Sequence, residues 1–108
     1  MGDRRIFQLH AVICQNLANA KRLEIIEHLR DGERTVGDLA AALGISQPNV
    51  SQHLAMMRRA GIVLARREGL NVHYRIASPK IVKACALMRE VLLEHLEAGA
   101  QLAEALRK

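Results

Sequence analysis

Aromatic residues are nearly absent from this chain of 108 residues, which holds one Phe, one Tyr and no Trp. Aliphatic side chains on helices must therefore supply most of the hydrophobic core. No apolar run approaches the ~20 residues of a membrane-spanning helix, and Met1 to Arg5 do not open an apolar signal segment. A cytoplasmic location without membrane contact is therefore expected. The length is typical of one domain, so residues 1–108 are predicted to form a single domain without a large interdomain cleft.

Cysteine is also scarce, because Cys14 and Cys85 are the only two and lie far apart in the sequence. This spacing excludes a disulfide framework and a Cys-x-x-Cys redox pair. The chain also lacks a Gly-rich phosphate loop and a Ser-His-Asp signature. We therefore expect no enzymatic activity and no obligatory cofactor. A nucleic-acid-binding protein and a pure protein-interaction module are the two classes left open.

Positive charge is concentrated in one part of the chain. The formal net charge is +5, and residues 1–45 hold six basic and six acidic side chains that cancel. Residues 46–76 hold Glu68 as their one acidic side chain and five arginines, namely Arg58, Arg59, Arg66, Arg67 and Arg75. Arginine binds phosphate through a bidentate fork, so this cluster is typical of a nucleic-acid-binding surface. A solvated basic face gives the same composition, and charge alone does not decide between the two.

Apolar residues at helical spacing, separated by caps and glycines, predict four helices in the first sixty residues. The first covers residues 5–17. The second begins after Asn19, buries Leu23, Ile26 and Leu29, and ends at Asp31-Gly32. The third lies between its cap Thr35 and Gly44. The fourth is capped by Ser46, carries Pro48 in its first turn, packs through Val50, Leu54 and Met57, and ends at Ala60-Gly61.

The period then changes from 3.6 to 2, which predicts a β-hairpin with strands 62–68 and 71–76 around Gly69-Leu70. Ser78-Pro79 opens a final helix of about 28 residues, or ~42 Å at 1.5 Å each. Its apolar seam repeats every 3.5 residues through Ile81, Cys85, Met88, Leu92, His95, Gly99, Leu102 and Leu106. So small a domain cannot cover this seam, so the pattern predicts pairing with a second chain.

Two short helices meeting at Leu43-Gly44-Ile45, followed by a basic hairpin, are typical of a winged helix-turn-helix. The expected fold is mainly α with a small β-hairpin wing. The fourth helix would enter the major groove and the hairpin would lie along the phosphate backbone. The residues expected to contact DNA are Ser46, Gln47, Asn49, Ser51, Gln52, His53, Arg58, Arg66, Arg67 and Arg75.

Three stretches of the chain resemble the ArsR/SmtB family of repressors: LANAKRLEII at residues 17–26, GISQPNVSQHL at residues 44–54 and RREGLNVHYR at residues 66–75. The resemblance implies a homodimer formed through the first and last helices, double-stranded DNA with a palindromic operator as partner, and repression relieved by a metal ion or by thiol chemistry. It also implies that the amide-rich helix faces DNA and that Arg66 and Arg67 anchor the wing.

The metal sites that the resemblance suggests are incomplete here. Thr35-Val36-Gly37 stands where family members carry a Cys-Val-Cys-like run, and Lys83 and Cys85, followed by His95 and Glu97, stand where others hold zinc. The hypothesis is instead that a disulfide or a polysulfide bridge joins Cys14 to Cys85 and shifts the spacing of the two DNA-reading helices. Lys83 and Arg89 flank Cys85 and are expected to favour its thiolate.

Two alternatives to thiol sensing stay open. A thiophilic ion such as arsenite, zinc or cadmium would bind a three-ligand set of His10, Cys14 and Cys85, since His10 lies one turn before Cys14. Alternatively, both cysteines are structural, because free Cys is among the most buried residue types and packs as a small hydrophobe.

Overall fold

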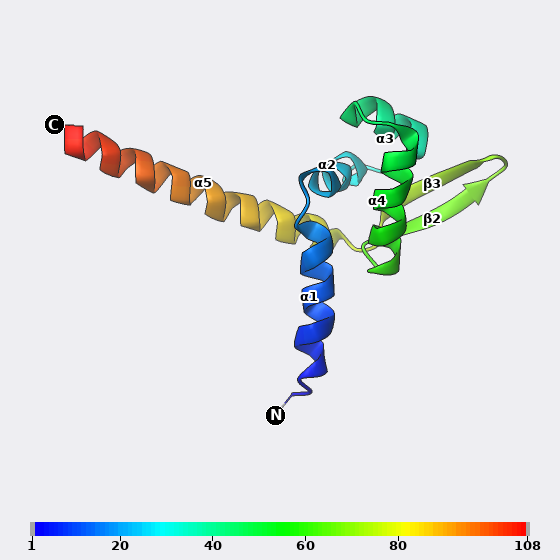
Figure 1. The fold of residues 1–108 in the computed structure, drawn as a ribbon, viewed down its shortest axis with the longest axis horizontal. Coiled ribbons are helices and arrows are strands. Elements are labelled where there is room, and N and C mark those ends of the chain that lie inside the picture. The colour runs from blue at the N-terminus through cyan, green and yellow to red at the C-terminus, as the bar shows by residue number, and fades with distance from the viewer. Residues whose placement is uncertain (1, 108) are drawn as a thin grey trace.

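The computed structural model describes residues 2–107, which form five helices and one three-stranded sheet. In chain order these are α1 (Arg5–Leu17), α2 (Ala20–Leu29), β1 (Arg34–Thr35), α3 (Val36–Leu43), α4 (Gln47–Arg59), β2 (Val63–Glu68), β3 (Asn71–Ile76) and α5 (Pro79–Arg107). The winged helix-turn-helix prediction is confirmed. Figure 1 shows α1 and α5 leaving a small body in different directions, with the β2–β3 hairpin on the side away from α5.

Local capping explains where the helices of the body begin and end. The side chains of Asn19, Thr35 and Ser46 each accept a hydrogen bond from a backbone N–H in the first turn of α2, α3 and α4. At Thr35 the bond is reciprocal, because the Asp38 carboxylate accepts the Thr35 N–H, which lowers the pKa of Asp38. Gly44 ends α3 with φ +68°, a left-handed conformation that allows the tight turn into α4.

The sheet has one strand more than the sequence predicts. The hairpin strands pair antiparallel in the expected register around Gly69-Leu70, and β1 adds to the far edge of β3 through Arg34 opposite Tyr74 and Thr35 opposite His73. A strand of two residues is too short to show an alternating pattern, so only its distant pairing partner defines it. β1 ties the wing to the segment that leads into α3.

The hydrophobic core is formed by α2, α3, α4, the start of β2 and one residue of α5. Its buried members are Ile25, Ile26, Leu29, Leu39, Ala40, Leu43, Val50, Leu54, Met57, Ile62, Val63 and Cys85. The prediction that Leu23 belongs to the buried face of α2 is wrong, because Leu23 is 37% exposed and Ile25 is buried in its place. Leu23 lies instead on the side of α2 that faces α1 and the start of α5.

The apolar faces of α1 and α5 are largely uncovered within one chain. Ile6, Leu9 and Ile13 of α1 are exposed, and Met88 and Leu92 of α5 are 68% and 52% exposed. Within residues 2–107, α5 packs against the core through Ile81, Val82 and Cys85 in its first turns, and Arg89 bonds to the Glu27 carboxylate of α2 at 3.1 Å. This arrangement agrees with the expectation that the seam of α5 pairs with a second chain. No helix among residues 2–107 combines the length and the apolarity needed to cross a bilayer.

Candidate nucleic-acid interface

Helix α4 buries one face and exposes the opposite one. Val50, Leu54 and Met57 are fully buried in the core. Helix α4 begins at Gln47, so the unpaired backbone N–H groups of its first turn lie beside the α3–α4 turn. The Ser46 hydroxyl accepts the Asn49 N–H at 3.3 Å, so part of its hydrogen-bonding capacity serves the cap. The side chains exposed on this end of α4 are Ser46, Gln47, Asn49, Ser51 and Gln52.

His53 differs from these neighbours because it is half-buried and has a partner inside the protein. The guanidinium Nε of Arg22, on α2, donates to His53 Nδ1 at 3.1 Å. Partial burial and, secondarily, the positive charge of Arg22 lower the pKa of His53 below its ordinary value. The imidazole is therefore neutral near pH 7, with its proton on Nε2, because Nδ1 must accept from an arginine that can only donate.

Arg66 and Arg67 are neighbours in sequence but lie on opposite faces of the wing, because side chains alternate along a strand. The Arg66 guanidinium donates to both carboxylate oxygens of Glu33, at 2.7 and 3.1 Å, and to Glu68 at 2.7 Å. These hydrogen bonds raise the pKa of Arg66 and lower the pKa of Glu33 and of Glu68. Arg66 is thus already held by two carboxylates in the free protein.

Arg67 lies on the face of the sheet that packs on the body, because it alternates with Ala65 and with the buried Val63. Helix α4 packs against β2 on this face. Arg75 lies on the other face, since it is opposite Leu64 and two residues along β3 from the partner of Arg66. Within residues 2–107, Arg67, Arg75 and Arg58 are exposed and form no ion pair.

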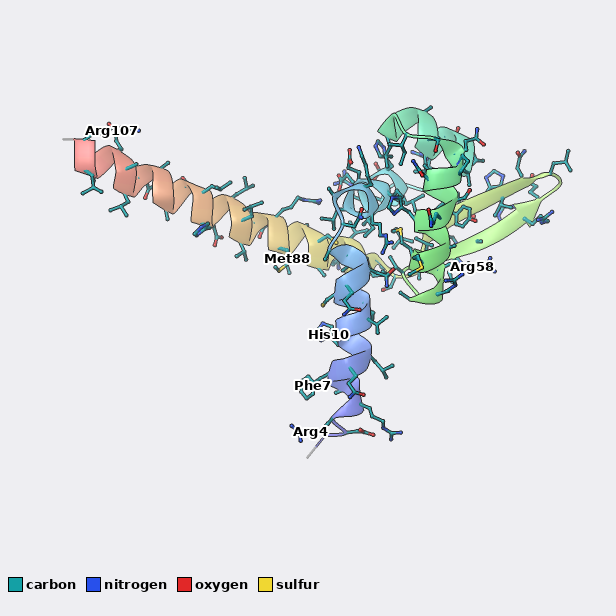
Figure 2. The ribbon with its side chains drawn as sticks, viewed as in Figure 1. Arg4, Phe7, His10, Arg58, Met88 and Arg107 are labelled. Atoms are coloured by element: carbon teal, nitrogen blue, oxygen red, sulfur yellow. The ribbon has the colours of Figure 1, made fainter. Side chains whose placement is uncertain are left out.

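Figure 2 shows Arg58 at the C-terminal end of α4. Arg67 lies near the tip of the hairpin, opposite Val72 and two residues before Gly69. The side of the body that carries α4 and Arg67 is therefore polar and basic, which suits a phosphate backbone and base edges, whereas Arg75 lies on the opposite face of the wing.

The two cysteines line one apolar groove of about 1000 Å³ between α1, α2 and the start of α5. Cys14 is exposed on α1, whereas Cys85 is buried on α5. Burial raises the pKa of the Cys85 thiol and outweighs the opposing effect of Arg89. The expectation that the flanking cations favour a Cys85 thiolate is therefore wrong, because the side chain sits in the core.

His10 lines the same groove. In Figure 2, His10 and Phe7 lie on the side of α1 from which α5 extends. Within one chain, however, residues 2–107 contain no cluster of three His, Cys, Asp or Glu side chains close enough to hold a metal ion. His10, Cys14 and Cys85 thus share a groove without forming a ligand set in a single subunit.

Sequence reasoning missed three residues that organise this region. Asn16 is buried in the otherwise apolar face of α1, Arg22 joins it to His53, and Glu33 holds Arg66. A polar residue between apolar helix positions was a usable signal for Asn16. Arg22 and Glu33 gave none, because their partners His53 and Arg66 lie 31 and 33 positions away.

Two solved structures with this fold come from mycobacteria. The crystal structure of Rv0081 from Mycobacterium tuberculosis superposes with a TM-score of 0.79 at 37% identity and covers 89% of this chain and 97% of that one. The homodimeric winged helix-turn-helix DNA-binding domain of Mb0332 from Mycobacterium bovis gives a TM-score of 0.81 at 37% identity, with 91% and 93% covered. Both likenesses extend well beyond the helix-turn-helix.

Sequence comparison leads to the same group of proteins. Residues 19–64 match the family described as "Bacterial regulatory protein, arsR family". The chain is 37% identical to Rv0081, an uncharacterized HTH-type transcriptional regulator, over 99% of this chain and 95% of that protein. It is 45% identical to the arsenical resistance operon repressor of Escherichia coli over 69% of this chain and 64% of that protein. The chain belongs to the ArsR family of bacterial helix-turn-helix transcriptional regulators.

Proposed function

We propose that this regulator is a homodimeric repressor that binds a palindromic operator and releases it when Cys14 and Cys85 are oxidised. The observation that carries the proposal is the division of one chain into two surfaces. The free N-terminus of α4 and the unpaired wing arginines suit duplex DNA, and the uncovered apolar faces of α1 and α5 suit a second copy of the chain. The dimer would present two α4 helices to successive half-sites, which requires an inverted repeat.

The positions of the two cysteines support thiol control. Each belongs to one of the two helices proposed to form the dimer, and both line the groove between those helices. The exposed Cys14 is the accessible nucleophile, and the buried Cys85, which lines the same groove from α5, is the second thiol that would resolve it. With peroxide as oxidant, the Cys14 thiolate attacks one oxygen to give a sulfenic acid and hydroxide. Cys85 then attacks that sulfur, forming the S–S bond and releasing water.

A bond between α1 and α5 would act on DNA binding from a distance. The separation of the two α4 helices must match one turn of DNA, and it depends on how α1 and α5 hold the subunits. Polysulfide would act at the same place by leaving a bridge of several sulfur atoms. In either case a local covalent change alters an inter-subunit spacing.

Footprinting on the DNA upstream of the protein's own gene tests the repressor assignment. Protection of an inverted repeat, with affinity that falls steeply as salt rises, supports it. No protection, or a salt-independent affinity, would favour a protein-interaction module instead. Sedimentation of the free protein checks the dimer in the same buffer.

The thiol mechanism is tested by replacing each of the two cysteines in turn, in Cys85→Ser and Cys14→Ser. Both variants are expected to bind the protected repeat like the untreated wild type and to lose the response to peroxide and polysulfide. Mass spectrometry of the treated wild type should show a loss of two hydrogens or a gain of sulfur atoms across the two residues. A Cys85→Ser protein that still releases DNA on oxidation would refute the mechanism.

A metalloid- or metal-responsive repressor is the second candidate. One relative is named an arsenical resistance operon repressor, and His10, Cys14 and Cys85 line one groove. Three ligands from two subunits would then hold arsenite, zinc or cadmium. Native mass spectrometry with each ion separates the two candidates. An ion that binds the wild-type dimer but not Cys14→Ser would favour the metal-responsive repressor.

A further inference from the structure

Helix α2 stands between the helices proposed to form the dimer and the helix proposed to read DNA. Within residues 2–107, α1 contacts the rest of the structure mainly through α2. Helix α5 also makes its main contacts with α2. Helix α2 also packs directly on α4. Figure 1 shows the consequence, since α1 and α5 both project away from the body and meet it next to α2. A displacement of α1 therefore reaches α4 through α2.

A chain of side-chain hydrogen bonds crosses α2 at one residue. Asn16, on α1, is 7% exposed, and it is the one polar residue that is buried among residues 2–107. Its Nδ2 donates to the Val12 carbonyl at 3.0 Å, and its Oδ1 accepts from Arg22 Nη1 at 3.2 Å. Arg22 Nε donates to His53 Nδ1 on α4 at 3.1 Å. Three helices are thus joined by a single guanidinium.

The geometry of this link depends on the planar fork of arginine. Nε and Nη1 point in different directions from one rigid group, so Arg22 holds Asn16 and His53 in a set relation. The backbone N–H of Arg22 donates to the Asn19 cap at 3.1 Å, which holds the base of the side chain in place. A lysine would keep the positive charge but offers one ammonium point, which cannot replace both directed bonds.

We propose that Arg22 couples the position of α1 to that of α4, with Asn16 and His53 as the two ends of the link. The inference rests on the proposed function, because it assumes that α1 belongs to the dimer interface. Asn16, Arg22 and His53 are then positioning residues, and His53 acts through its Nδ1 acceptor rather than by contacting a base. The link sets the orientation of α4 and thereby favours the operator over other DNA.

The test uses five variants of the full-length protein kept reduced: Asn16→Ala, Arg22→Lys, His53→Ala, His53→Asn and the double variant Arg22→Lys/His53→Ala. Asparagine places an amide oxygen close to the position of the Nδ1 of histidine, so His53→Asn keeps the acceptor and removes everything at Nε2. Fluorescence anisotropy measures affinity for the footprinted repeat and for a scrambled duplex of equal length. Thermal unfolding and sedimentation confirm that each variant is a folded dimer at the assay temperature.

We expect Asn16→Ala, Arg22→Lys and His53→Ala each to lower the ratio of operator to scrambled affinity by about fivefold or more, the lower end of allosteric couplings. His53→Asn should stay within about twofold of the wild type, and the double variant should be no worse than either single change. Arg22→Lys should keep the salt dependence of the wild type, because Arg22 does not contact phosphate in this scheme. The ¹⁵N shifts of His53 should report an Nε2–H tautomer in the wild type that changes in Arg22→Lys.

Three results would overturn the link. One is an unchanged affinity ratio in Asn16→Ala and Arg22→Lys. Another is a loss in His53→Asn equal to that in His53→Ala, which would make His53 a base contact through Nε2. The third is additive losses in the double variant. A wild-type protein that is monomeric or protects no repeat overturns the proposed function itself, and that outcome is visible before any variant is measured.

Discussion

The two adjacent wing arginines are expected to contribute very differently to DNA binding. Arg66 is held by Glu33 and Glu68 on one face of the hairpin, whereas Arg67 has no carboxylate partner among residues 2–107 and lies on the face next to α4. Arg66→Gln and Arg67→Gln change the net charge by the same amount. Only the loss of Arg67 should remove a phosphate contact.

The expected size of the effect follows from counterion release. Each phosphate contact contributes a slope of about −0.9 to log affinity against log salt. A fourfold rise in salt, from about 50 to about 200 mM, therefore weakens binding about 3.5-fold per contact. Because the proposed dimer carries two copies of Arg67, Arg67→Gln should make the slope shallower by about 1.8 and weaken binding most at low salt. Arg66→Gln should leave the slope unchanged.

Fluorescence anisotropy with a labelled duplex, titrated at four salt concentrations, measures these slopes. Glu33→Gln adds a third case, since it frees the Nε and Nη2 donors of Arg66. That variant should show a slope as steep as the wild type or steeper. Equal losses of slope in Arg66→Gln and Arg67→Gln would refute the reasoning, because the carboxylates would then not withhold Arg66 from phosphate.

Three further predictions concern the stability of the body. Leu54→Ala, at a fully buried position, should lower the free energy of unfolding in urea by about 2–5 kcal/mol. Gly44→Ala should cost about 1–2 kcal/mol by the same measurement, because φ is +68° and an added Cβ meets no neighbour, so only backbone strain acts. The lowered pKa of His53 predicts that the free energy of unfolding falls as the pH drops below about 6.5, because the unfolded state then binds a proton that the folded state binds less readily. His53→Asn should remove this part of the pH dependence.

Most of the fold could be predicted from the sequence because its determinants are local. Asn19, Thr35 and Ser46 each cap a helix by bonding a backbone N–H three residues on. Gly44 and the Gly69-Leu70 turn likewise act within a few residues. Periodicity and capping therefore located every helix and the hairpin. The sequence did not predict β1, because its two residues form a strand only through pairing with the distant Tyr74 and His73.

The candidate site was predicted less completely, for the same physical reason. Residue type marked Gln47, Asn49 and Arg67 as suited to DNA, and the structure exposes all three. It could not show that Glu33 engages Arg66 or that Arg22 engages His53, because such pairings depend on how the elements pack. The raised pKa of Cys85 could not be predicted either, because it depends on burial, which outweighs the effect of the neighbouring Arg89.

The placement of the core has a consequence for how the protein can be regulated. Among residues 2–107, every buried apolar residue lies between Ile25 and Cys85, so neither α1 nor the part of α5 beyond Cys85 contributes one. The DNA-reading body is therefore stabilised without the surfaces proposed for dimer contacts. A change at those surfaces can then move one subunit relative to the other without unfolding either. Because α2 is the common neighbour of α1, α4 and α5, even a small shift of the dimer helices acts first on the element that supports α4.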